Sequence, residues 1–134
     1  MQTPKLFNNT LAVLILFAAL PVSHAGPQDL LAEYQQASAQ KLSIERGKYL
    51  HTQNFAQGKA DTPACTSCHG KSPLDSGKTL TGKRIEPMAV SVSPNRYQDR
   101  AKVEKWFKRN CTEVLGRECT AQEKGDWLSY MLSL

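Results

Sequence analysis

Apolar positions recur at helical spacing in four segments of the chain. The first segment covers residues 27–39, where Leu30 and Tyr34 share one side of a short amphipathic helix. The second begins at Ser43, a favourable N-cap residue, and ends near Gln53. Both segments lie ahead of the motif that carries the chemistry, so we expect them to supply packing surface.

The third predicted helix begins at the N-cap Asp99 and ends at Asn110. Val103, Trp106 and Phe107 lie on the same face as Asn110, because they are spaced three or four residues apart. This face should point into the protein. An asparagine on it needs explaining, because a buried polar side chain requires a partner.

The fourth predicted helix begins at a capping box formed by Thr120 and Glu123. Its inner face is apolar and consists of Trp127, Leu128, Met131 and Leu132. The second helix contains Gly47, which costs about 1 kcal/mol relative to alanine. A glycine there lets another helix cross closely. The pattern therefore predicts an all-α fold in which an N-terminal helix crosses the C-terminal one.

The segment between the second and third helices carries the most specific motif. Residues 65–69 read Cys-Thr-Ser-Cys-His, the C-x-x-C-H signature of covalent haem c attachment. The thiols of Cys65 and Cys68 would add to the two haem vinyl groups, and His69 would ligate the iron. A redox dithiol would need a βαβ context, and a zinc site would need a second ligand pair. We therefore expect one covalent haem c, wrapped by the long irregular loop of residues 70–95.

The N-terminus has the form of a secretory signal peptide. Lys5 is followed by a ten-residue apolar run, Leu11–Leu20, and then by the small-x-small site Ser23-His24-Ala25. The run is too short to span a bilayer, although an uncleaved anchor is the alternative. We expect residues 1–25 to be removed and residues 26–134 to form a single domain. Haem c is attached outside the cytoplasm, so the expected location is the periplasm.

Charge adds little to this picture. Removing Lys5 leaves 16 lysines and arginines against 12 acidic residues, a formal charge of +4. Export excludes nucleic acid as the target of this basic surface. It could help docking to an acidic redox partner, or it could be a solvated face with no partner.

Two cysteines remain after haem attachment. Cys111 and Cys119 are eight positions apart, and unpaired thiols are hazards in an oxidising compartment. We expect a disulfide between them, with free thiols as the alternative.

Several residues could occupy the iron position opposite His69. Met88 would give the thioether ligation of many electron carriers, but it follows His69 by only 19 residues, with no helix between. Met131 suits core packing better. His51 would give bis-histidine ligation or would be a surface residue. Asn110 would be a weak, hard oxygen ligand that suits ferric iron, or it would bond carbonyls at a helix end.

The region from about Ser43 to the C-terminus resembles the sphaeroides haem protein family, oxygen-binding class I cytochromes c. The resemblance is carried by four motifs: CTSCHG, TGK-x-I-x-PM, KVEKWF-x-RNC and LGREC-x-x-x-EKGD. It implies a small class I cytochrome c-like fold. Residues before Ser43 are not covered by it.

The resemblance also implies roles for individual residues. Cys65 and Cys68 would carry the haem and His69 would be the proximal ligand. The family's sixth ligand is the asparagine directly before the first disulfide cysteine, here Asn110 before Cys111. In the family this asparagine dissociates on reduction, and the iron can then bind oxygen or nitric oxide. Diheme cytochromes c are the expected electron donors.

The expected function is thus a monomeric haem protein that accepts electrons and then binds oxygen, NO or CO. It would meet a membrane only through a redox partner. A plain electron carrier with permanent His/Met ligation is the first alternative, and a haem enzyme reducing oxygen, peroxide or NO is the second. Further candidates are Lys83, Arg84 and Trp127 as propionate partners, and the Pro87 carbonyl as acceptor for His69 Nδ1.

Overall fold

The computed structural model describes residues 26–134, so the signal peptide predicted for residues 1–25 lies outside the described part. The elements are α1 (Pro27–Gln36), α2 (Ile44–Thr52), α3 (Thr66–His69), β1 (Gly77–Lys78), β2 (Arg84–Ile85), α4 (Arg100–Leu115) and α5 (Ala121–Leu132). The all-α prediction is confirmed, with one addition: β1 and β2 pair as a short antiparallel hairpin. Within residues 26–134 no helix is long and apolar enough to cross a membrane.

The predicted helix starts are confirmed. The Ser43 hydroxyl accepts a hydrogen bond from the Arg46 amide at 3.2 Å and caps α2. Asp99 caps α4 in the same way, and Thr120 opens α5 with a complete capping box. Each cap satisfies a backbone N–H group that the helix itself leaves without a partner.

Two predicted helix ends are wrong. Helix α4 does not stop at Asn110 but continues to Leu115 and ends at Gly116, which has a φ of +72°. Its last turn continues because Val114 and Leu115 are buried. Helix α1 ends at Gln36. The Ser38 hydroxyl donates to the Tyr34 carbonyl, which would accept a backbone amide if the helix continued.

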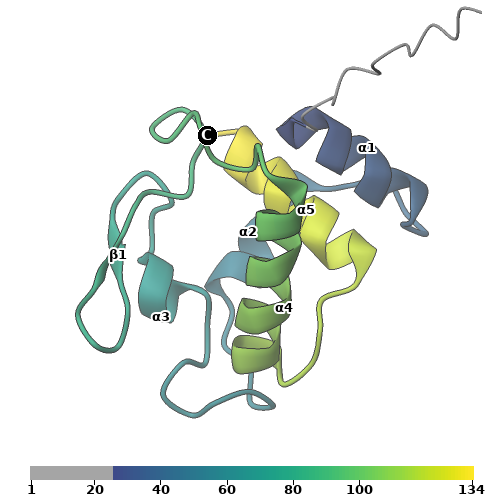
Figure 1. The fold of residues 1–134 in the computed structure, drawn as a ribbon. Coiled ribbons are helices and arrows are strands. Elements are labelled where there is room, and N and C mark those ends of the chain that lie inside the picture. The colour runs from purple at the N-terminus through teal and green to yellow at the C-terminus, as the bar shows by residue number, and fades with distance from the viewer. Residues whose placement is uncertain (1–25) are drawn as a thin grey trace, which may run out of the picture.

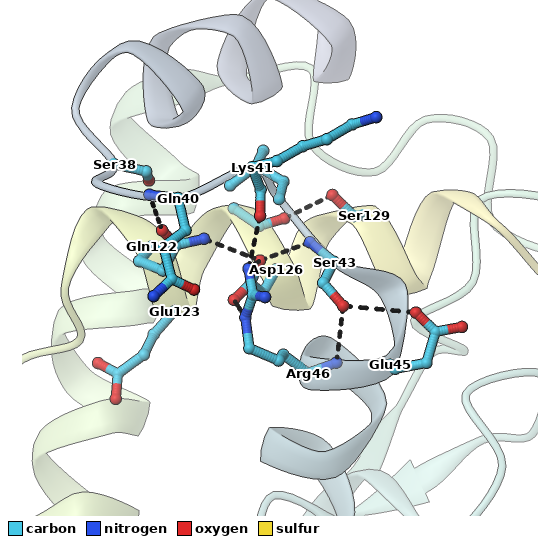
Figure 2. A network of polar contacts seen from close by, with 12 residues as sticks. Ser38, Gln40, Lys41, Ser43, Glu45, Arg46, Gln122, Glu123, Asp126 and Ser129 are labelled. Carbon is cyan, nitrogen blue, oxygen red and sulfur yellow. Dashed lines mark hydrogen bonds and ion pairs between the residues drawn. The ribbon is translucent and has the colours of Figure 1, made fainter.

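The close crossing predicted at Gly47 is confirmed. Helix α2 packs on α5, and a Cβ at position 47 would lie 2.0 Å from the Asp126 carbonyl oxygen. Asp126 is 3% exposed, and its carboxylate accepts from the Ser43 amide, from the Arg46 guanidinium and from Gln122 (Figure 2). This network fixes the start of α2 against α5.

The loop side of the molecule is built around α3. Figure 1 shows the hairpin beside α3, on the side away from α1. A Cβ at Gly77 would lie 2.0 Å from the Cys68 carbonyl, so only glycine allows this contact. At the other side of the motif, Gly58 packs equally closely on the backbone of Val114 in α4. The hairpin thus packs on the C-x-x-C-H segment, and the loop that leads to this segment packs on the end of α4.

Candidate haem site

The two motif cysteines sit on the one-turn helix α3 and its N-cap. Both are free thiols of intermediate exposure, not joined to each other. Burial raises the pKa of Cys65 to about 11, and burial together with Glu113 and Asp61 raises the pKa of Cys68. Both are therefore thiols at neutral pH, which disfavours the activated thiolate of a redox dithiol. Two adjacent free thiols fit the attachment of a haem through its vinyl groups.

His69 is held as a neutral imidazole. Burial, with repulsion from His51 and Arg96, lowers its pKa to about 4. Its Nδ1 atom is buried and has no hydrogen-bond partner among residues 26–134, whereas the ring as a whole is half-buried. The accessible side of the ring is thus the Nε2 side. A neutral imidazole with Nε2 accessible is what iron ligation requires, so the donor set fits haem c.

Asn110 lies on the face of α4 that the sequence predicts. It is half-buried, and its amide makes no hydrogen bond within the described residues. The bonds to local carbonyls considered as an alternative are therefore absent from that part of the chain. Because α4 continues beyond it, Asn110 sits inside the helix and not at its end. It is thus an uncommitted polar side chain on a rigid backbone.

Trp106, one turn before Asn110, corrects part of the predicted inner face. Val103 is buried, but Trp106 is 43% exposed, and the Arg109 guanidinium lies 5.4 Å from its ring centre. The apolar stripe is narrower than the spacing suggests. Asn110 lies at the edge of that stripe, between buried Val103 and exposed Trp106.

The Met88 side chain is part of the buried core. It is 7% exposed and belongs to a buried cluster with Leu50, Trp127 and Met131. Its backbone is held at both ends: the amide donates to the Pro73 carbonyl at 2.8 Å, and its carbonyl accepts from the Tyr97 hydroxyl at 2.7 Å. This environment accounts for the methionine without iron.

His51 is not the surface residue considered from the sequence; it is fully buried. Its Nδ1 accepts a hydrogen bond from Trp127 Nε1 at 3.3 Å, and its Nε2 is also enclosed by protein. Neither nitrogen is open to an iron atom, which disfavours bis-histidine ligation. The chain offers no local signal for this pair, because its two members are 76 residues apart.

The residues expected to contact the haem propionates or His69 Nδ1 either have other partners or are exposed. The Trp127 N–H bonds His51, so it is not free for a propionate. The Pro87 carbonyl accepts from Arg96 Nε at 2.5 Å and not from His69. Lys83 and Arg84 are exposed, and Arg84 pairs with Glu86 at 2.9 Å.

The expected disulfide pair is joined in the structure. Cys111 and Cys119 have an S–S distance of 2.03 Å. Cys111 directly follows Asn110 on α4, and Cys119 lies just before α5. The bond therefore ties the helix that carries Asn110 to the start of the C-terminal helix.

Three comparisons place this arrangement among known proteins. A family model described as a domain of unknown function (DUF1924) matches residues 37–131. The cytochrome c-type protein SHP of Cereibacter sphaeroides is 46% identical over 105 residues, covering 78% of this chain and 81% of that protein.

Solved structures agree with these matches. Oxidized SHP, described as an oxygen-binding cytochrome c, superposes with a TM-score of 0.80 at 44% identity, covering 82% of this chain and 98% of the other. Cytochrome c'' of Methylophilus methylotrophus, in a solution structure concerned with haem-ligand detachment, has a TM-score of 0.68 at 32% identity and covers 81% and 93%. The chain therefore has the small cytochrome c fold and belongs to the sphaeroides haem protein family of c-type cytochromes, which carry covalently bound haem c.

Proposed function

We propose that the protein is a periplasmic monohaem cytochrome that accepts an electron and then binds oxygen, or a related diatomic such as NO, at a displaceable sixth iron position. Cys65 and Cys68 hold the haem, and His69 is the permanent ligand. Asn110 is the ligand that leaves. When bound, the haem supplies an iron whose affinity for diatomic gases depends on its oxidation state and on a free axial position.

The uncommitted amide of Asn110 is the observation that carries this proposal. A half-buried amide without a hydrogen bond, on a helix whose neighbouring turns are packed, has a ligand role available to it. The neutral amide oxygen is a hard donor and favours ferric over ferrous iron. Reduction therefore weakens this bond specifically.

The two alternatives have less support. A permanent His/Met carrier needs Met88, whose side chain is packed in the core. A peroxidase-type enzyme profits from a distal acid–base histidine. His51 is the remaining histidine of the predicted mature chain, and its ring is enclosed and bonded to Trp127.

The proposal also includes an electron donor and a cellular location. The likeness to SHP, an oxygen-binding cytochrome c, supports gas binding by this chain. We propose a diheme cytochrome c as donor and the periplasm as the location, with the protein acting as a monomer. The formal +4 charge of the predicted mature chain suits an acidic partner.

The test compares wild type with Asn110→Ala in the haem-loaded protein. Wild type reduced without oxygen should give a high-spin spectrum that shifts on adding CO. In the ferric state, Asn110→Ala should replace the spectrum of a six-coordinate iron by that of a five-coordinate iron. If Asn110 fills at least about 90% of ferric sites, its removal tightens the apparent affinity for cyanide about tenfold or more.

Met88→Leu is the matched control, because it keeps core volume and removes the thioether. Its ferric spectrum and cyanide affinity should equal those of wild type. A ferrous spectrum that stays low-spin and ignores CO would overturn the open-site function. A ferric spectrum that changes in Met88→Leu but not in Asn110→Ala would establish the plain carrier instead.

A further inference from the structure

Helix α4 carries a row of exposed side chains that has no part in the proposed ligation of the iron. Its members recur at positions i, i+3, i+4 and i+7, so they lie on one side of the helix. We call this row the basic stripe; it consists of Lys102, Lys105, Trp106 and Arg109. At a rise of about 1.5 Å per residue it extends for about 10 Å along α4. Three positive charges and one large aromatic ring are thus concentrated on a small surface.

The cations of the basic stripe have no acidic partner within the described part of the chain. Their side chains are exposed and take part in none of the ion pairs formed among residues 26–134. The acidic residues of α4 are paired with other lysines: Glu104 accepts from Lys124 at 2.6 Å, and Glu113 accepts from Lys59 at 3.3 Å. The positive potential of the stripe is therefore directed toward solvent, where it can attract an acidic surface.

Trp106 gives the basic stripe an apolar centre. The Arg109 guanidinium lies 5.4 Å from the centre of its ring, and this cation–π contact holds both groups in one arrangement. Tryptophan and arginine are enriched among the residues that contribute most binding energy at protein interfaces. Lysines at the edge of an interface act mainly on the rate of encounter. The composition of the stripe therefore fits a protein interface better than a solvated helix face.

The basic stripe borders the residue that we propose as the sixth iron ligand. Trp106 lies one turn before Asn110 on α4, and Arg109 directly precedes it. A protein bound to the stripe is thus close to the proposed iron position, and electron transfer requires a short separation between the two redox centres. The small extent of the stripe also suits the small interfaces of transient electron-transfer complexes.

We propose that the basic stripe is the docking face for the electron donor, and that the donor presents an acidic surface to it. This inference rests on the proposed function, in which the iron accepts an electron from a redox protein. During the encounter one electron passes from the donor to the ferric iron, and no atom is exchanged between the two proteins. The charges of the stripe steer the donor, and Trp106 supplies the apolar contact.

The experiment measures electron transfer to the haem-loaded ferric protein from flavodoxin hydroquinone, which serves as an acidic one-electron donor. Rapid mixing without oxygen gives the second-order rate constant at several ionic strengths. The test variant is Lys102→Glu/Lys105→Glu, which reverses two charges of the stripe. The matched control is Lys41→Glu/Lys48→Glu, which makes the same change of formal charge at two exposed lysines outside α4 that form no ion pair among the described residues.

The rates of the two variants should differ. At about 10 mM ionic strength, where the Debye length is about 30 Å, the test variant should be reduced about tenfold or more slowly than wild type. At about 1 M salt this difference should fall below about twofold, because the charges are then screened. The control variant should stay within about threefold of wild type throughout.

Cross-linking provides a second measurement that needs no variant. A carbodiimide joins lysines directly to carboxylates that lie in contact with them. In the complex of wild type with flavodoxin, the cross-linked peptides should contain Lys102 or Lys105, and not Lys41 or Lys48. Cross-links confined to lysines outside the stripe would overturn the docking face, as would equal slowing of the two double variants, which would show that only net charge matters.

Other occupants of the stripe would give different results. Vesicles of phosphatidylcholine and phosphatidylglycerol should bind wild type and the test variant equally weakly. Vesicle binding that only the test variant loses, together with equal flavodoxin rates, would assign the stripe to an anionic membrane surface. A dimer in sedimentation that only the test variant loses would assign it to a second copy of the chain.

Failure of this inference is separable from failure of the proposed function. A reduced wild type that ignores CO contradicts the proposed function, whatever the flavodoxin rates are. Normal CO binding by wild type and both variants, with flavodoxin rates that do not differ between them, overturns only the docking face. The test variant should keep the ferric spectrum and the CO binding of wild type. A change in either would show that its lysines act on the haem site itself and would also overturn the docking face.

Discussion

Asp126 shows how a single buried charge organises this fold. Its carboxylate is almost fully enclosed, yet each oxygen is used: Ser43 and Gln122 donate to Oδ1, and the Arg46 guanidinium donates to both (Figure 2). Because Arg46 also donates to the Lys41 carbonyl at 2.6 Å, the same network fixes the connection between α1 and α2. A buried charge is tolerated only with such complete pairing.

Asp126→Ala should lower the free energy of unfolding by about 2–4 kcal/mol, because it removes several hydrogen bonds and leaves their donors without an acceptor. Urea denaturation of the haem-loaded protein measures the change. The matched control is Glu45→Ala, at an exposed carboxylate on α2 whose only contact in the same network is a 3.4 Å bond from Ser43. That variant should stay within about 0.5 kcal/mol of wild type. Equal effects of the two substitutions would contradict the role of the network.

At the scale of helices, local signals predict starts better than ends. Caps such as Ser43 and Asp99 act through bonds within three residues, so they can be identified from the chain alone. The end of α4 depends on burial of Val114 and Leu115 against distant segments, and no nearby breaker precedes Gly116.

The residues of the candidate site differ in the same way, because some could be identified from the sequence and others could not. The C-x-x-C-H motif and the asparagine next to a cysteine are contiguous in sequence and could be identified there. The burial of His51 could not, because its partner Trp127 comes from another helix. The width of the apolar face around Trp106 is likewise set by what packs on α4, not by periodicity.

The start of α5 predicts a pH effect. Glu123 accepts from the Thr120 amide at 2.8 Å, and Arg117 holds the pKa of its carboxyl below the usual range. A folded-state pKa below the unfolded value gives stability that is present above about pH 4.5 and is lost as pH falls through the folded pKa. Glu123→Gln should therefore cost about 1 kcal/mol at pH 7 and progressively less below pH 4.5.

Unfolding curves between pH 3 and 7 measure this dependence. Glu118→Gln serves as the comparison, since Glu118 forms only an exposed pair with Lys108, with side chains 60% and 73% exposed. Such pairs contribute little. A cost for Glu123→Gln that does not change with pH would show that the charge of Glu123 is not what stabilises the helix start.

For the molecule as a whole, the disulfide and the crossing of α2 with α5 hold the helices together. Cys111 and Cys119 close a short loop between α4 and α5. The hairpin lies beside the haem segment α3 (Figure 1). The helix that carries Asn110 is thus fixed to the start of α5 by the disulfide.

The double variant Cys111→Ser/Cys119→Ser should lower the free energy of unfolding by about 2–3 kcal/mol, the chain-entropy value for so short a loop. Its ferric protein should also show a larger fraction of five-coordinate iron, because the turn that carries Asn110 is no longer held. Urea denaturation and the visible spectrum measure the two effects. Wild type whose disulfide has been reduced and alkylated, and whose iron has then been reoxidised with ferricyanide, is the control and should reproduce both. An unchanged ferric spectrum would show that the disulfide has no influence on Asn110.

The continuation of α4 beyond Asn110 has a kinetic consequence. Since the backbone at this position is mid-helix, the proposed ligand can leave only by rotation of its own short side chain, a motion of picoseconds to nanoseconds. A released amide therefore stays within reach of the iron and acts as an intramolecular competitor at high effective concentration. Any external ligand of the ferric protein has to win this competition at every encounter. In the proposed function, discrimination between oxidation states would follow from a tethered competitor whose affinity changes on reduction, with no movement of the fold.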